Sequence, residues 1–114
     1  MKPIYPITYI MSSDNIEKLE KDLEYYDCWT FKRVLGSYKG VQEKSLMVID
    51  DREYTVLNIA KKHNQECVLK LDMTRFASLI TPDGKVTPLG QFTAVNEKPD
   101  GDYTFDGFTF YTIK

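Results

Sequence analysis

The sequence has few of the residues that build common catalytic and metal centres. It contains one histidine and two cysteines in 114 residues. That is too few cysteines for a disulfide scaffold, and too few of both types for a typical zinc site. No spacing typical of a zinc, calcium or nucleotide-phosphate motif occurs. We therefore expect no bound metal and no cofactor.

A surplus of charge of one sign is also missing. The 15 basic and 17 acidic residues give a net charge of −2. Nucleic-acid-binding proteins usually display a basic surface, so a nucleic-acid partner is not expected. No segment approaches the roughly 20 apolar residues of a membrane helix, and the first residues do not form a signal peptide. With two cysteines that suit free thiols, we expect a cytosolic protein without a membrane partner.

What the sequence does contain is an alternation of strand-like and helix-like segments. Up to residue 71, the predicted order is strand, helix, strand, strand, helix, strand, which is the ferredoxin-like βαββαβ arrangement. Four further strand-like segments follow, with turn signals at Pro82-Asp83-Gly84 and Asp106-Gly107. The predicted fold is a single α+β domain of two layers. In it, a four-stranded sheet carries two helices and is extended by a C-terminal antiparallel meander or hairpin. The predicted strands are 4–11, 28–35, 45–49, 66–71, 76–80, 86–94, 103–105 and 108–113. The first helix is predicted to begin at the N-cap Asp14, in the capping cluster Ser12-Ser13-Asp14-Asn15. The second is predicted to run from about Glu53 to His63, with Asn64 as its left-handed C-cap.

Three polar residues stand at the ends of otherwise apolar strand segments. Glu43 and Ser45 share one face of a predicted strand, and Gln65 precedes the strand that follows the second helix. They could form a buried network that fixes the loop, since buried polar groups must be hydrogen-bonded. Alternatively, they could line a small polar pocket, with Arg33 or Lys39 contacting an anion. The second hypothesis describes a small nucleotide-binding protein or enzyme.

His63 is the only histidine, and histidine is the usual general base near neutral pH. It could be combined on paper with Ser45, Cys67 and Glu43, but nothing in their spacing requires that assembly. His63 falls at the predicted carboxyl end of the second helix. A capping or packing role is therefore favoured over catalysis.

Aromatic residues make up 13% of the chain and suggest a surface for a partner. Tyr38 and Lys39 lie between two glycines on a predicted loop tip, where recognition residues are common. Phe108 lies in the predicted C-terminal hairpin. We expect these residues to contact a partner, and an exposed sheet edge leaves a homodimer as a third hypothesis.

The segment GSYKGVQEKSLMV, followed by YTVLNIAKKHNQECVL, resembles short bacterial and phage proteins grouped as domain of unknown function 3293. This resemblance covers roughly residues 4–71. It implies a phage or bacterial origin but supplies no activity. The leading hypothesis is a small, non-enzymatic phage-type binding protein in the bacterial host cytosol. It would act in host takeover or against host defence, either by inhibiting a bacterial protein or by sequestering a small signalling ligand.

Overall fold

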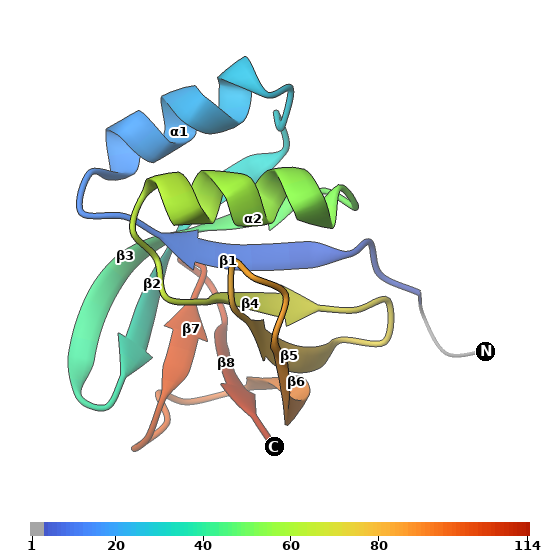
Figure 1. Ribbon diagram of the computed structural model, residues 1–114. Coiled ribbons are helices and arrows are strands. Elements are labelled where there is room, and N and C mark those ends of the chain that lie inside the picture. The colour runs from blue at the N-terminus through green and yellow to red at the C-terminus, as the bar shows by residue number, and fades with distance from the viewer. Residues whose placement is uncertain (1–3) are drawn as a thin grey trace.

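The chain folds into an eight-stranded antiparallel β-barrel with two helices packed on one side (Figure 1), as seen in a computed structural model that describes residues 4–114. The elements are β1 (Thr8–Ser12), α1 (Ile16–Tyr25), β2 (Phe31–Tyr38), β3 (Val41–Ile49), α2 (Glu53–Lys62), β4 (Val68–Leu71), β5 (Phe76–Ile80), β6 (Val86–Val95), β7 (Tyr103–Phe105) and β8 (Phe110–Ile113).

The predicted ferredoxin-like fold is wrong, although the first six elements follow the predicted order. Around the barrel the strands run β1-β3-β2-β7-β8-β6-β5-β4, and β4 pairs with β1 to close the ring. The four C-terminal strands therefore join β2 to β4 instead of extending one edge of a sheet. Closure depends on the tilt and stagger of every strand, which alternation within single segments does not reveal.

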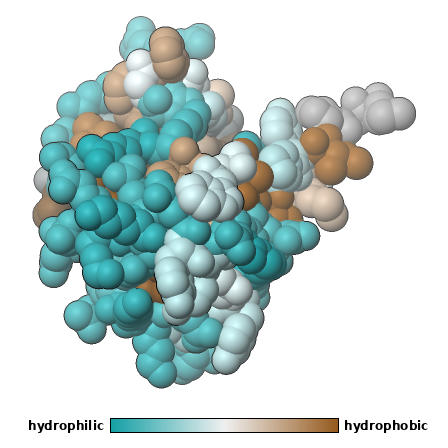
Figure 2. Space-filling model, turned by 90° about the horizontal axis from the view of Figure 1, so that it is seen from above, coloured by the Kyte–Doolittle hydropathy of each residue, from teal (hydrophilic) through white to brown (hydrophobic). Residues whose placement is uncertain are grey.

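Two apolar cores result, one on each face of β1. All five residues of β1 are buried. Tyr9 and Met11 pack under the helices, whereas Ile10 faces the barrel interior. The helix-side core also contains Leu19, Leu23, Cys28, Leu46, Val48, Val56, Leu57, Ile59, Ala60, Val68 and Ile80, and the interior core contains Val34, Met47, Leu71, Ala77 and Phe92. The outer surface above the helices is mostly hydrophilic (Figure 2), as expected for amphipathic helices.

The two helices begin and end through local hydrogen bonds. The Asn15 side chain accepts from the Lys18 N–H at 3.1 Å, so Asn15 is the N-cap of α1, not Asp14 as predicted. At the end of α2, Asn64 has φ 57° and provides the left-handed residue that was predicted there. The Gln65 N–H then donates to the Ala60 carbonyl at 3.0 Å, which fixes where Gln65 leaves the helix. Neither helix, within the part of the chain that the structure describes, is long and apolar enough to cross a membrane.

The predicted loop between residues 36 and 40 is a much tighter turn. Strand β2 continues to Tyr38 and β3 starts at Val41, so only Lys39 and Gly40 connect them. Their φ angles of 50° and 81° fit a two-residue hairpin turn with positive φ at both positions. The β2–β3 hairpin extends beyond the body of the barrel (Figure 1).

A glycine lets β6 bend where the barrel closes onto the C-terminus. The register between β5 and β6 shifts between Ala77 and Ser78, opposite Gly90. Gln91 and Lys114 exchange two backbone hydrogen bonds, at 2.8 and 2.9 Å. A Cβ on Gly90 would overlap the carbonyl oxygen of Lys114. Gly90 therefore makes room for the last residue of the chain.

Candidate functional site at the barrel mouth

One face of the β2–β3 hairpin continues the inner surface of the barrel. Cross-strand partners point to the same side of a sheet, and here Val34 pairs with Ser45 and Gly36 with Glu43. Val34 belongs to the interior core, so Gly36, Glu43 and Ser45 lie on the interior side. Tyr38, two residues beyond Gly36, has the same orientation. We call the surface formed by Gly36, Tyr38, Glu43 and Ser45 the hairpin face.

Two serine residues lie where the hairpin face enters the barrel. Ser12 pairs with Ser45, and the Ser12 hydroxyl donates to the Lys44 carbonyl at 2.7 Å. The Ser45 hydroxyl has no hydrogen-bond partner among residues 4–114, and Ser45 is only 6% exposed. A Cβ on Gly36 would lie 3.6 Å from this hydroxyl, so the glycine keeps it approachable. The Ser45 hydroxyl is therefore free to hydrogen-bond a ligand.

Glu43 provides an uncompensated negative charge at this opening. Its side chain is exposed and has no ion pair among the described residues, whereas Glu53 is bonded to Lys70 at 2.8 Å. Burial, followed by the carboxylates of Glu66 and Glu43, raises the pKa of the Cys67 thiol. The Glu43 carboxylate therefore acts electrostatically on Cys67, which directly precedes β4. A free carboxylate in this position can bind a cationic ligand.

Gln65 lies on the short segment between α2 and β4. Its side chain is half-buried. Continuing the β1–β4 register by two residues places Cys67, two residues after Gln65, opposite Ser12. No hydrogen bond links Gln65 to Glu43 or Ser45 within the part of the chain that is described. Arg33 forms an ion pair with Glu20 of α1 at 2.7 Å, and the contact of Arg33 or Lys39 with an anion stays a prediction.

The residues predicted to contact a partner lie near opposite ends of β7. The Lys39 N–H donates to the Asp102 carboxylate at 2.8 Å, which places Tyr38 and Lys39 beside the start of β7. Phe108 is 94% exposed in the loop that follows the other end of β7. Tyr38 therefore belongs with Glu43, and Phe108 lies apart from both.

His63 contacts neither Ser45, Cys67 nor Glu43. It is the C-cap residue of α2, and its ring lies between Ser13 and Asp22. The sequence contained no signal for this contact, because Ser13 and Asp22 are 50 and 41 residues away. Elsewhere in residues 4–114, no group of three His, Cys, Asp or Glu side chains could hold a metal ion.

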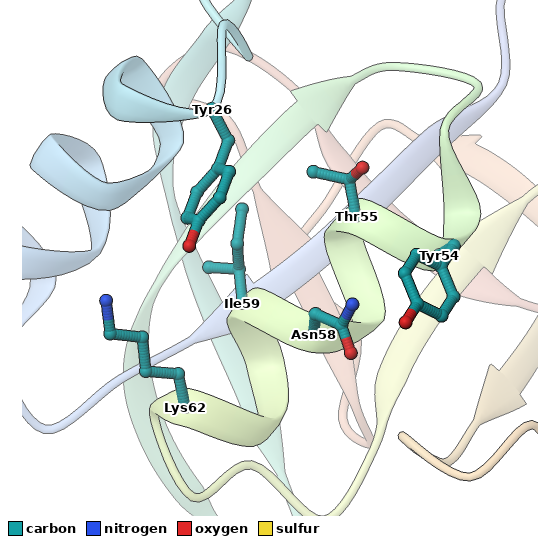
Figure 3. A pocket seen from close by; sticks show the side chains of 6 residues that line it. All are labelled: Tyr26, Tyr54, Thr55, Asn58, Ile59 and Lys62. Carbon is teal, nitrogen blue, oxygen red and sulfur yellow. The ribbon is translucent and has the colours of Figure 1, made fainter.

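Two shallow hollows lie away from the hairpin face. The first has a volume of about 200 Å³ between the end of α1 and the exposed side of α2 (Figure 3). Tyr26 and Ile59 lie at its centre, Tyr54 at one end and Lys62 at the other. The second has a volume of about 190 Å³ beside Lys70 and Phe76. Both fall below the roughly 300–1,000 Å³ of typical ligand sites.

The fold and the hairpin face together define a small barrel that presents, among the described residues, an exposed carboxylate at Glu43 and an unbonded hydroxyl at Ser45. The sequence model of the S-Adenosylmethionine lyase family matches residues 11–114, which is nearly the whole chain. The chain therefore belongs to this family. A comparison with curated proteins finds no match.

The family match corrects two predictions made from the sequence. The resemblance to domain of unknown function 3293 is wrong, because the matching family is a different one. The hypothesis of a non-enzymatic, phage-type inhibitor in host takeover or anti-defence falls with it, because the family is defined by an enzymatic activity. The short motifs behind that resemblance were not specific enough to identify the family.

Proposed function

We propose that this protein binds S-adenosylmethionine and cleaves a carbon–sulfur bond at its sulfonium without using water. The observation that supports this most strongly is the family match, which includes the whole hairpin face. Glu43 is exposed and has no ion pair among residues 4–114, which adds support because S-adenosylmethionine is a cationic ligand at neutral pH. The sequence-based alternative of a nucleotide-binding protein or enzyme at Glu43, Ser45 and Gln65 agrees with this proposal.

The chemistry requires little from the protein beyond positioning. The sulfonium is already a good leaving group, and the substrate's own carboxylate can reach its γ-carbon. A carboxylate oxygen forms a bond to that carbon while the carbon–sulfur bond breaks and its electron pair stays on sulfur. The products are methylthioadenosine and homoserine lactone, and no proton is transferred. Holding the substrate in the folded, near-attack conformation and excluding water are the main contributions left to the enzyme.

The charges that change during this reaction suggest where Glu43 acts. The sulfonium and the attacking carboxylate both lose charge in the transition state, whereas the α-ammonium group keeps its charge. A protein carboxylate on the sulfonium would stabilise the bound substrate more than the transition state, which slows the reaction. We therefore assign Glu43 to the α-ammonium group. The Tyr38 ring on the same face offers a flat surface for the adenine, and Ser45 and Gln65 offer hydrogen bonds to the ribose.

A second copy of the chain could cover the hairpin face, which lies open beyond the barrel. The homodimer hypothesis therefore stays a prediction. The exposed sheet edge on which it was first based is not present among the described residues. The sheet of residues 4–114 is closed and offers no free edge for pairing. Sedimentation or native mass measurement, with and without substrate, would determine the assembly. The two free cysteines fit the cytosolic location that we propose.

The assignment of Glu43 is tested by Glu43→Gln. Loss of a charge-assisted contact of about 1.5–3 kcal/mol should lower kcat/KM by roughly 10- to 150-fold. Most of the loss should appear in KM, because the ammonium contact is equal in substrate and transition state. The measurement is chromatographic quantification of methylthioadenosine over a range of substrate concentrations.

Glu97→Gln is the matched control, since Glu97 is also exposed but lies in the loop before β7. It should change kcat/KM by less than about twofold, the scale of a neutral surface substitution. Equal losses in the two variants would contradict a specific role for Glu43.

A further inference from the structure

A serine, a histidine and an aspartate form a continuous hydrogen-bonded chain at the two helices, outside the hairpin face. The Ser13 hydroxyl lies 2.7 Å from His63 Nδ1, and His63 Nε2 lies 2.7 Å from the Asp22 carboxylate. The side chains of His63 and Asp22 are only 7% and 8% exposed. A serine is activated when a base contacts its hydroxyl and a third group orients that base, and this arrangement occurs on unrelated folds.

The surroundings of Asp22 set the direction of these hydrogen bonds. Burial raises the pKa of Asp22, but hydrogen bonds from Lys18 and His63, together with the nearby Lys62, lower it overall. Lys18 Nζ lies 3.0 Å and Lys62 Nζ 3.8 Å from the carboxylate. An ionised Asp22 accepts the Nε2–H of His63, which leaves Nδ1 of the neutral ring to accept the Ser13 proton. This is the tautomer that a general base requires.

Ser13 occupies a position suited to a nucleophile. It lies in the short turn between β1 and α1 and is half-exposed, unlike the His63 ring behind it. The Asn15 N–H donates to its hydroxyl oxygen at 3.0 Å. The N–H groups of Ile16 and Glu17, in the first turn of α1, have no partner among the described residues. Free N–H groups at a helix N-terminus can stabilise the oxyanion of an acyl-transfer step.

We propose that Ser13 is a reactive nucleophile, activated by His63 and Asp22, that hydrolyses small carboxylic esters. The Ser13 oxygen attacks the ester carbonyl carbon while its proton passes to His63 Nδ1. The carbon–oxygen bond to the alcohol then breaks, and the alcohol leaves with that proton. Water attacks the acyl-serine and gives a proton to His63, which returns it to the Ser13 oxygen as the acid is released. This activity goes beyond sulfonium cleavage and uses no residue of the hairpin face.

The competing explanation is a purely structural link. The same contacts join the β1–α1 turn to both helices, and a buried, fully bonded polar chain can serve only to fix them. A structural link does not make a serine hydroxyl attack an electrophile. Covalent labelling therefore separates the two explanations, and it does so independently of any turnover of S-adenosylmethionine.

The test is incubation of the whole, folded protein with a fluorophosphonate probe, followed by intact mass measurement and peptide mapping. We expect one adduct, on Ser13, that heat-denatured protein does not form. Ser13→Ala should abolish it, and His63→Gln should slow it at least about 100-fold, the typical contribution of a general base. Ser78→Ala, at a half-buried serine of β5, should label like the wild type. Hydrolysis of p-nitrophenyl acetate should follow the same order among the variants.

The wild-type protein decides the question even where a variant fails to fold. No adduct, or an adduct on another residue, would overturn the proposal and leave the structural link. Labelling of Ser13 at an unchanged rate in folded His63→Gln would overturn it as well, because the histidine would not be the activating base.

Discussion

The helix-covered wall of the barrel and its uncovered wall are built from different sequence patterns. Every residue of β1, under the helices, is buried, whereas only Phe92 is buried among the ten residues of β6. The covered wall buries a second apolar core between strand and helix, in addition to the barrel interior. A strand buried on both faces has a continuous apolar run, and a strand with one wet face does not. Stability should therefore be concentrated in the covered wall.

The largest expected effect compares one leucine from each wall. Leu46 of β3 is 0% exposed and Leu89 of β6 is 42% exposed. Leu46→Ala should lower the free energy of unfolding by about 2–5 kcal/mol, because it leaves a cavity under the helices. Leu89→Ala should cost less than about 1 kcal/mol. Urea denaturation of both variants measures the difference, and equal losses would show that the two walls contribute alike.

A smaller effect should identify the place where the uncovered wall depends on close packing. Gly90→Ala should cost about 2–3 kcal/mol, because a methyl group would force the C-terminal backbone away and φ is 151° there. Gly84, with φ 94° and open space around it, is the control, and Gly84→Ala should cost about 1 kcal/mol. Thermal unfolding compares the two. If Gly84→Ala lowers the free energy of unfolding as much as Gly90→Ala does, the positive φ angle alone explains why glycine is needed at position 90.

The smallest effect is a pH-dependent contribution to the covered wall. The pKa of Asp22 is lowered in the folded protein. The ionised carboxylate therefore stabilises the fold at pH values above the ordinary pKa of an aspartate. This stabilisation is lost as the pH falls through the lowered pKa of the folded state. Asp22→Asn should therefore cost about 1–2 kcal/mol near pH 7. The difference from the wild type should shrink below about pH 4, the ordinary range of an aspartate. Denaturation curves at pH 7 and pH 3 test this, and a constant difference would rule out ionisation as the cause.

The same two patterns explain how much of the fold could be predicted. Alternation and capping signals located the elements well, including the left-handed Asn64 at the end of α2. They also placed Glu43 and Ser45 on a common strand face, which the register supports. Closure of the barrel was missed because β7 and β8 are short strands whose partners, β2 and β6, were not evident from local sequence.

Contacts between distant segments limited prediction of the functional residues in the same way. Ser13 was part of a capping cluster, and nothing local connected it to His63. Tyr38 and Phe108 lie near opposite ends of β7, and their joint contact with a partner stays a prediction. Strand alternation determines which side a residue faces, but only the three-dimensional fold determines which residues meet.

The most direct test of the central claim is to incubate the purified protein with S-adenosylmethionine in ¹⁸O-labelled water and analyse the products at early times by mass spectrometry. Cleavage by the substrate's own carboxylate predicts methylthioadenosine together with homoserine lactone that contains no ¹⁸O. Homoserine that has acquired one ¹⁸O before any lactone accumulates would show that water is the nucleophile. Unchanged S-adenosylmethionine at enzyme concentrations where the protein is folded would contradict the proposed function itself.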